Sequence, residues 1–180
     1  MSVANIVEKL GGDPNSKQPL RLWLRLLSCS MVIEKRIRHQ LAEEFGTTLP
    51  RFDLMAALDR HPGGLTMSEL SSSMLVSNGN ITAIVERLVE EGLVERRQDE
   101  ADRRVLHVAL TPRGRRQFVA MAAVHESWID AMMANLTQRD LDALLDGLHR
   151  LRVSVESNPI GGDRAAKSRI RAAKARQSRP

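Results

Sequence analysis

The segment from residue 77 to residue 87 carries side chains suited to contacts with double-stranded DNA. It begins with short polar and small residues and has an arginine one turn further on. Short amides and hydroxyls can reach base edges in the major groove, and a helix N-terminus favours a phosphate. The candidate DNA contacts are Ser77, Asn78, Gly79, Asn80, Thr82, Ala83 and Arg87. Ordinary polar helix surfaces contain the same residue types, so this segment alone leaves both interpretations open.

An arginine-rich stretch between residues 93 and 110 supplies a second set of candidates. Arginine at the end of a hairpin can enter the minor groove, where the negative potential is strongest in narrow A·T tracts. The arginines are Arg96, Arg97, Arg103 and Arg104, and the candidate DNA contacts among them are Arg97, Arg103 and Arg104. Four acids lie in the same stretch, so a self-neutralised hairpin in solvent is the alternative. One of these acids, Asp102, can pair with a neighbouring arginine and is predicted to stabilise the tip.

A helix pair followed by a hairpin would position these side chains. Thr66 and Glu69 have the spacing of a capping box at the start of a short helix. Ser77 is predicted to cap a second helix, in which apolar residues at 81, 84, 85 and 88 follow helical spacing and Gly92 forms the end. Beyond Gly92 the period changes toward 2, which predicts two strands joined by a charged tip. We therefore predict a winged helix-turn-helix with a two-stranded β wing.

Longer helices flank this winged helix-turn-helix. The first is expected over residues 20–45 with two apolar stripes, so it should be buried on more than one side, and its first half should meet a second subunit. Pro50 suits the first turn of the next helix. Thr111 with Pro112 begins a further helix, and Thr137 with Asp140 begins the last. The predicted fold class is therefore mainly α, with a helical dimerisation region beside the winged helix-turn-helix.

The net charge of +5 comes from the end of the chain. Residues 159–180 hold seven basic residues and one acid, a net charge of +6, so residues 1–158 carry a net charge of −1. This tail has too little apolar surface to fold alone and is predicted to be disordered. We divide the chain into an N-terminal arm (1–19), a helical dimerisation region (20–48 and 112–157), a winged helix-turn-helix DNA-binding region (49–111) and a basic tail (158–180).

Several classes of protein do not fit the sequence. The longest uncharged run, residues 70–85, is short and polar for a membrane span. No secretory signal is recognised, and a single cysteine cannot form an internal disulfide, so we expect a cytoplasmic protein. The sequence has no phosphate-binding glycine loop, nucleophile elbow or His-Glu-x-x-His motif. We therefore predict neither an enzyme nor a resident cofactor.

Four segments together resemble the MarR family of bacterial transcriptional regulators: 65–70 (LTMSEL), 81–96 (ITAIVERLVEEGLVER), 102–104 (DRR) and 110–114 (LTPRG). The resemblance covers residues 20–156 and implies an obligate homodimer, whose interface is built by the first helix and the last two. It implies that residues 77–83 with Arg87 read the major groove and that Arg103 or Arg104 enters the minor groove. The implied partners are a pseudo-palindromic double-stranded DNA operator, a second copy of the chain and a small-molecule effector, with no membrane.

Three further segments are similar to MarR members that control hydroxycinnamate and other aromatic-acid catabolism: 20–27 (LRLWLRLL), 48–54 (TLPRFDL) and 76–82 (VSNGNIT). This similarity implies a repressor released by an aromatic acid or its CoA thioester, such as p-coumaroyl-CoA. Aromatic rings could stack on the acyl group and arginines could meet the phosphates of coenzyme A. The candidate effector contacts are Arg21, Trp23, Arg25, Arg38, Arg51 and Phe52. Alternatively, Trp23 anchors the subunit interface and the arginines are solvated helix edges.

A MarR-type sensor of oxidants through Cys29, or of another small phenolic ligand, is the alternative function. Reactive thiolates need electropositive or hydrogen-bonding surroundings. Tyrosine hydroxyls help to supply these in peroxide-sensing relatives, and this chain has no tyrosine. Cys29 also lies on an apolar stripe between Leu26 and Ile33, so we expect it to be buried and inert.

Two further alternatives concern metals and protein partners. A metal sensor needs clustered ligands, but the five histidines include no pair at helical spacing, so no metal site is predicted: His39, His61, His107, His125 and His149. A winged helix used only for protein contacts predicts that Arg103→Ala and Arg104→Ala leave DNA binding unchanged, whereas a regulator predicts a clear loss.

Overall fold

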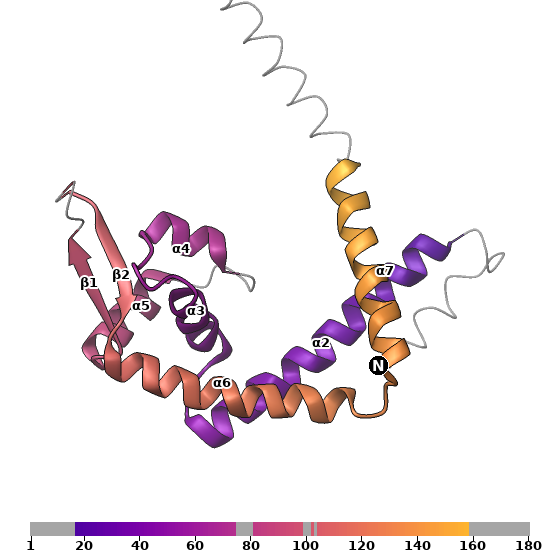
Figure 1. The fold of residues 1–180 in the computed structure, drawn as a ribbon, viewed down its shortest axis with the longest axis horizontal. Helices are drawn as coiled ribbons and strands as arrows, with labels where there is room; N and C mark the ends of the chain where they lie inside the picture. Colours follow the sequence, from indigo (N-terminus) through magenta and orange to yellow (C-terminus); the bar gives the residue numbers. More distant parts are fainter. Residues whose placement is uncertain (1–16, 75–80, 99–101, 103, 159–180) are drawn as a thin grey trace, which may run out of the picture. The chain divides into compact units, whose positions relative to one another are not determined.

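The computed structural model describes residues 17–74, 81–98, 102 and 104–158. Its elements are α2 (Gln18–Phe45), α3 (Leu49–Asp59), α4 (Met67–Ser73), α5 (Ile81–Glu90), β1 (Val94–Gln98), β2 (Leu106–Leu110), α6 (Pro112–Met133) and α7 (Gln138–Ser157), as Figure 1 shows. The predicted fold, mainly helical with a two-stranded antiparallel wing, is confirmed. The chain divides into two compact units, Met1–Met132 and Met133–Pro180.

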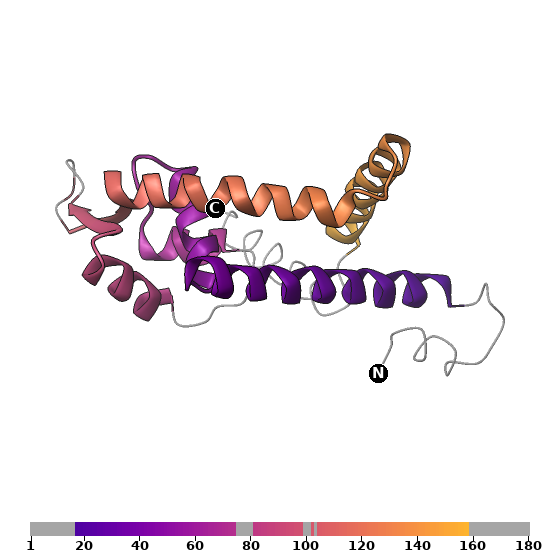
Figure 2. The same ribbon diagram turned by 90° about the horizontal axis from the view of Figure 1, so that it is seen from below.

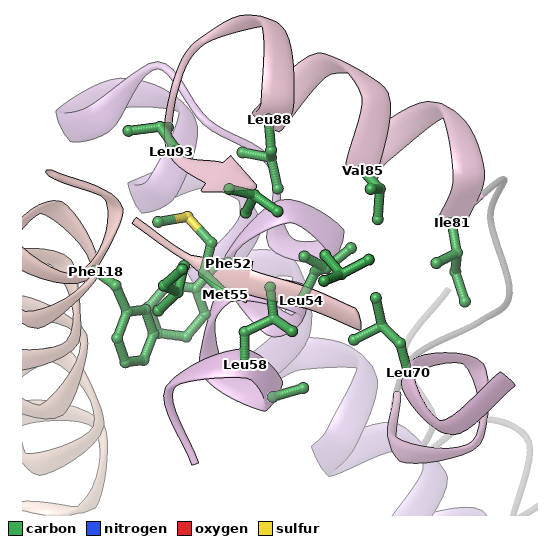
Figure 3. Packing of buried hydrophobic residues seen from close by; sticks show 14 of the residues in the cluster. Phe52, Leu54, Met55, Leu58, Leu70, Ile81, Val85, Leu88, Leu93 and Phe118 are labelled. Carbon is green, nitrogen blue, oxygen red and sulfur yellow. The ribbon is translucent and has the colours of Figure 1, made fainter. Parts of the chain in front are cut away.

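The first unit has an apolar core to which α3, α4, α5, the hairpin and α6 all contribute (Figure 3). Its most deeply buried side chains include Leu54, Leu58, Leu70, Val85, Leu88 and Met121. Burial of each large aliphatic side chain stabilises the fold by about 1.5–3 kcal/mol. Because Val85 and Leu88 belong to this core, α5 is held by one face and its opposite face is left for other contacts.

The hairpin pairs β1 with β2, with Val94 opposite Leu110 and Gln98 opposite Leu106. Leu65 also joins this sheet through a bridge to Val108, which the sequence did not predict. The Leu65 N–H donates to the Val108 carbonyl at 2.9 Å, and the Val108 N–H donates to the Leu65 carbonyl at 2.7 Å. A bridge formed by a single residue has no alternating hydrophobic pattern, so the local sequence does not predict it. It ties the start of α4 to the wing.

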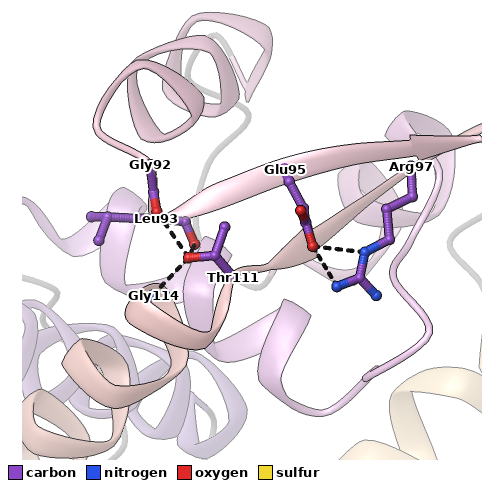
Figure 4. Close-up of polar contacts among 6 residues, drawn as sticks. All are labelled: Gly92, Leu93, Glu95, Arg97, Thr111 and Gly114. Carbon is purple, nitrogen blue, oxygen red and sulfur yellow. Dashed lines mark hydrogen bonds and ion pairs between the residues drawn. The ribbon is translucent and has the colours of Figure 1, made fainter.

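Thr111 and Gly114 join the hairpin to α6 (Figure 4). The Thr111 hydroxyl accepts a hydrogen bond from the Gly114 N–H at 2.9 Å, which caps α6 as predicted, and donates to the Gly92 carbonyl at 2.8 Å. A Cβ atom on Gly114 would lie 1.9 Å from the Leu93 carbonyl oxygen. Only glycine therefore permits α6 to approach the main chain before β1 this closely.

The predicted helix ends are confirmed where the structure describes them. In the capping box of α4, the Glu69 N–H donates to Thr66 Oγ1 at 3.3 Å and the Thr66 N–H donates to Glu69 Oε2 at 2.8 Å. These hydrogen bonds lower the pKa of Glu69. Gly46 ends α2 with a φ of 58°, a left-handed conformation that favours glycine. Pro50 lies in the first turn of α3.

The long helix α2 extends beyond the core of the first unit (Figure 2). In α2, Ile37 and Leu41 are buried, whereas the first half exposes large apolar side chains. These are Leu20, Leu22, Trp23, Leu27, Met31 and Val32, each 38–60% exposed. The single chain leaves these side chains exposed, and the expectation that the first half of the helix meets a second subunit stays a prediction.

Cys29 lies on the exposed half of α2 and is itself exposed. The expectation that it is buried is therefore wrong for the single chain. The reason is that α2 packs against its own core only in its second half, from Ile33 onward. The apolar stripe correctly predicted which face of α2 packs against the core. It did not predict where along the helix this packing begins.

The second unit contains α7, which begins at the predicted capping box. The Thr137 hydroxyl donates to Asp140 Oδ2 at 2.6 Å, and the Asp140 N–H donates to Thr137 Oγ1 at 3.3 Å. Hydrogen bonds from Thr137 lower the pKa of Asp140. None of the residues of α7 is buried, and its exposed large apolar side chains are Leu144, Leu145, Leu148, Val153 and Val155. Across the described residues, the helices are too short or too polar for a membrane span.

Candidate nucleic-acid interface

α5 presents a polar face opposite its buried face. Ile81, Val85 and Leu88 are buried, whereas Thr82 and Arg87 are exposed and Ala83 is half-buried. The predicted contacts Ser77, Asn78, Gly79 and Asn80, and the predicted cap at Ser77, lie outside the described residues. In the described part of the helix, Thr82, Ala83 and Arg87 therefore lie on the face away from the core, where DNA could contact them.

The acids of α5 limit which part of it can meet DNA. Glu86 and Glu90 lie in the later turns. Carboxylates repel phosphates, whereas the partial positive charge of a helix N-terminus attracts them. The first turn carries no acid. This distribution favours an approach to DNA by the N-terminal end of α5, the geometry usual for recognition helices.

The residues that follow α5 are held by three side chains. Arg51 of α3 forms a two-pronged ion pair with Glu91: its Nη1 donates to Oε1 at 2.8 Å and its Nη2 donates to Oε2. The Arg51 guanidinium lowers the pKa of the Glu91 carboxyl. Arg113 of α6 donates to the Glu91 carbonyl at 3.1 Å, and Thr111 donates to the Gly92 carbonyl at 2.8 Å.

The wing carries its described arginines on exposed positions. Arg96, Arg97 and Arg104 are exposed, and Arg97 Nε donates to Glu95 Oε1 at 2.7 Å (Figure 4). The Arg104 N–H donates to Asp102 Oδ1 at 2.9 Å, and the Val105 N–H donates to the Asp102 carbonyl at 2.9 Å. Asp102 thus fixes the backbone that leads from the tip into β2. Arg103 lies outside the described residues.

The six predicted effector contacts do not form one cluster. Arg21, Trp23 and Arg25 lie at the start of α2, about 20–25 Å along the helix from Arg38. Phe52 is buried in the core, with ring centroids 5.5 Å from Phe118 and 4.9 Å from His125. Arg51 is engaged by Glu91 as described above.

Arg38 lies in a mixed cluster of charges between α2 and α3. Its Nε donates to Glu34 Oε1 at 2.9 Å. Asp53 lies nearby: burial raises the pKa of this carboxyl, and the positive charge of Arg38 opposes that rise. Because two carboxylates share its charge, Arg38 is less suited to an anionic ligand than its sequence context indicated.

A cavity of about 240 Å³ lies between α2 and α6, within the first unit. It is lined by Arg36, Ile37, His39, Gln40, Trp128, Ala131 and Met132. Sequence reasoning did not select these residues. The i, i+3, i+4 spacing of Arg36, His39 and Gln40 places them on one edge of α2, beside Ile37. The sequence near this edge does not show that it faces Trp128 of α6.

A set of aromatic rings connects this cavity to the core. The Trp128 ring lies 6.1 Å from Phe45 and 6.2 Å from His125, and His125 lies 4.9 Å from Phe52. Burial lowers the pKa of His125, which favours its neutral form among these rings. A wall of the cavity is therefore in packing contact with the core that holds α5.

Metal binding finds no support in the part of the chain that the structure describes. Within residues 17–74, 81–98, 102 and 104–158, no three His, Cys, Asp or Glu side chains come together as metal ligands would.

Comparison with known proteins agrees with the winged-helix geometry. A model described as the MarR family matches residues 45–105. The chain is 30% identical to the transcriptional activatory protein BadR of Rhodopseudomonas palustris, over 68% of this chain and 70% of BadR. It is 29% identical to the HTH-type transcriptional repressor YetL of Bacillus subtilis, over 76% of this chain and 83% of YetL.

A solved structure gives the same result at the level of the fold. The crystal structure of a MarR family transcriptional regulator from Silicibacter pomeroyi is 27% identical, covers 79% of this chain and 99% of its own, and has a TM-score of 0.69. Members of this family are DNA-binding regulators, typically dimers, and are not enzymes. The polar face of α5, the arginine-bearing wing and these similarities lead to one conclusion: the chain belongs to the MarR family of transcriptional regulators.

Proposed function

We propose that the chain is a repressor that binds a pseudo-palindromic DNA operator as a homodimer and is released by an aromatic acid or its CoA thioester. The observation that carries the DNA-binding part is the division of α5 into two faces. Val85 and Leu88 fix the helix to the core, while Thr82 and Arg87 remain exposed. Short hydroxyl and guanidinium groups on such a face can contact base edges and phosphates in the major groove.

The wing supplies the second part of the proposed DNA surface. Arg104 is exposed beside the backbone fixed by Asp102, and Arg103 precedes it in the chain. We assign Arg103 or Arg104 to the minor groove and Arg97 to the neighbouring phosphates. Arg97 is partly neutralised by Glu95, so we expect its contribution to be the smallest of the three.

The homodimer is supported by uncovered apolar surface in each unit. The first half of α2 exposes Leu22 and Trp23, and α7 exposes Leu144 and Leu145. Contiguous apolar side chains of this kind usually mark an interaction site. A two-fold dimer would present two copies of α5 to half-sites about one helical turn apart, which is why we propose a pseudo-palindromic operator.

The cavity between α2 and α6 supports a small planar effector. Trp128 offers an aromatic surface, and Arg36 and His39 offer positive or hydrogen-bonding groups for a carboxylate or thioester. The exposed Arg25 and half-buried Arg21 stay candidates for the phosphates of a CoA thioester. To release the operator, the effector must bind the free protein more tightly than the DNA-bound protein.

The test begins with selection of an operator from random duplex DNA by the full-length protein. The protein–operator complex is then titrated with p-coumaroyl-CoA, feruloyl-CoA, the two free acids and, as controls, coenzyme A and acetyl-CoA. The proposal expects release by at least one aromatic compound and by neither control. If none of them releases the operator, the aromatic effector is refuted while DNA binding stands.

Two variants decide which residues meet the effector. Arg36→Ala should weaken release while leaving operator affinity in the absence of effector unchanged, if the cavity is the site. Arg21→Ala tests the alternative site, since it removes one arginine from the same helix far from the cavity. If only Arg21→Ala weakens release, the site at the start of α2 predicted from the sequence is correct instead.

The sign of regulation needs its own measurement, because relatives carry both names, repressor for YetL and activatory protein for BadR. A reporter gene behind the selected operator, with and without the regulator, measures it directly. A repressor lowers expression, and the effector restores it. Higher expression in the presence of the regulator would contradict the proposed sign.

A further inference from the structure

We propose that Arg51 and Glu91 form a clamp that sets the direction of α5 for operator binding. Both are positioning residues, which act through the start of α5 rather than by touching DNA. The inference rests on the proposed function, since it requires that the start of α5 meets the operator.

The ion pair between Arg51 and Glu91 is bidentate. Two nitrogens of the Arg51 guanidinium meet the two oxygens of the Glu91 carboxylate, and the residues are 40 positions apart in the chain. Such a two-pronged contact fixes orientation as well as distance, which a lysine at the same place could not do. The Arg51 side chain is 21% exposed and the Glu91 side chain 44%, so water screens the pair and its two-pronged geometry, not burial, distinguishes it from a typical surface ion pair.

Two main-chain contacts complete the clamp at the same point. Arg113 holds the Glu91 carbonyl and Thr111 holds the Gly92 carbonyl, at 3.1 Å and 2.8 Å. Side chains from α3, from the start of α6 and from the residue before α6 thus converge on the two residues that follow α5. The helix is therefore held at its end as well as along its core face.

Because α5 is long, a small tilt at its C-terminal end displaces its N-terminal end by a larger distance. Ile81 and Glu91 are ten residues apart, or about 15 Å of helix. A tilt of about 10° at Glu91 would therefore move the start of the helix by roughly 2.6 Å. Hydrogen bonds to base edges tolerate a range of only about 0.5 Å in length, so even a tilt of about 2°, which moves the start by about 0.5 Å, would weaken the base contacts.

The clamp also changes the charge of the surface near DNA. Glu91 is the third acid in the last turns of α5 and the residue after it, with Glu86 and Glu90. Arg51 lowers the pKa of Glu91 and also neutralises its negative charge locally. This assignment gives Arg51 a role within the DNA-binding region in place of the predicted contact with an effector phosphate.

Charge reversal tests the clamp. We would measure operator affinity by fluorescence anisotropy for full-length Arg51→Glu, Glu91→Arg and the double variant that exchanges the two charges. Each single reversal should weaken operator binding about tenfold or more, which corresponds to about 1.4 kcal/mol. The exchange should recover most of the loss. The two single reversals change the net charge in opposite directions, so a purely electrostatic effect on DNA would give opposite signs.

The conservative pair Arg51→Gln and Glu91→Gln covers the case in which a charge reversal fails to fold. The matched control is Arg115→Gln, which breaks the ion pair between Arg115 and Asp59 in the same unit without touching α5. The clamp predicts weaker operator binding for both glutamine variants at an unchanged melting temperature relative to the control. Operator affinity equal to wild type, or an exchange variant no better than the single reversals, would overturn it.

The same experiment separates failure of the clamp from failure of the proposed function. Arg104→Ala is measured beside the clamp variants on the selected operator. If Arg104→Ala weakens binding and the clamp variants do not, the clamp is wrong and the DNA-binding proposal stands. If the wild-type protein selects no operator at all, both are wrong.

Discussion

α5 of the first unit and α7 of the second have the same helical spacing of apolar residues but differ in what covers them. In α5 the apolar face is buried at Ile81, Val85 and Leu88. In α7, which is twice as long, no residue is buried. Apolar periodicity therefore predicts that a helix face will be covered, but not whether the covering residues belong to the same chain.

α2 contains both situations in one helix. Ile37 and Leu41 lie in the core of the first unit, whereas Leu22 and Trp23 earlier in the helix are exposed. Its second half resembles α5 in this respect, and its first half resembles α7. In the proposed homodimer, α7 and the first half of α2 would be covered by a second copy of the chain, whereas α5 is covered within its own chain.

Glycine substitutions give the largest contrast between the two regions. Gly114→Ala should destabilise the first unit by on the order of 4 kcal/mol, because the new Cβ would lie 1.9 Å from a main-chain oxygen. Gly147→Ala in α7 is the matched control, since the added Cβ would have no neighbouring atom within 4 Å and alanine favours a helix. Thermal unfolding measures both. Equal destabilisation would contradict the packing described for Gly114.

Leucine substitutions sharpen the comparison at the level of assembly. Leu88→Ala should destabilise the fold by about 3 kcal/mol at any protein concentration, because it opens a cavity in the core. Leu145→Asp should instead shift the dimer to monomers, because this side chain is 67% exposed in the single chain. Analytical ultracentrifugation over a range of concentrations measures the second effect. A Leu145→Asp variant that remains dimeric would remove α7 from the interface.

Acidification tests a half-buried histidine of the first unit, His125. Burial lowers the pKa of His125, so the unfolded chain takes up a proton at a higher pH than the folded chain. Stability is therefore present above the ordinary histidine pKa of about 6.5 and is lost as the pH falls below it. His125→Phe keeps a ring beside Phe52 and should reduce this loss in melts between about pH 7 and about pH 5. The exposed His149 of α7 provides the control substitution, and equal curves for His125→Phe and wild type would contradict this account.

The helix caps should give the smallest effects, and similar ones in both regions. Thr66→Ala and Thr137→Ala each remove an exposed capping box and should lower the melting temperature by a few degrees at most. The partner carboxyls, Glu69 and Asp140, have lowered pKa values. Their contribution is present above the usual carboxyl pKa and is lost as the pH falls below about 4. The difference in melting temperature between each variant and wild type should therefore become smaller in acid, where the hydrogen bond from the backbone N–H to the Thr hydroxyl is left.

Local chemistry explains which parts of the fold the sequence predicted well. The caps at Thr66 and Thr137 involve partners three residues away, and the αL end at Gly46 involves one residue, so short-range pattern is sufficient. The hairpin was predicted from its change of period. The bridge from Leu65 to Val108 and the exposure of Cys29 were not, because both depend on packing between distant segments.

The candidate site divides in the same way. Thr82 and Arg87 were expected on the polar face of their helix and lie there, since helical spacing alone determines faces. Their roles at DNA stay predictions, as do those of the residues outside the described part of the chain. The pairing of Arg51 with Glu91 and the cavity beside Trp128 join residues far apart in sequence, for which local pattern contains no signal.

The central claim is that DNA is bound by the start of α5 and the tip of the wing, and matched removal of charge tests it most directly. Arg103→Ala with Arg104→Ala removes two charges from the wing, and Arg139→Ala with Arg150→Ala removes two from α7. The measured quantity is the dissociation constant for the selected operator at one salt concentration. We expect the wing variant to bind about tenfold or more weakly, since an arginine contact contributes about 1–3 kcal/mol, and the α7 variant to bind nearly as wild type. Equal losses from both variants would contradict the claim.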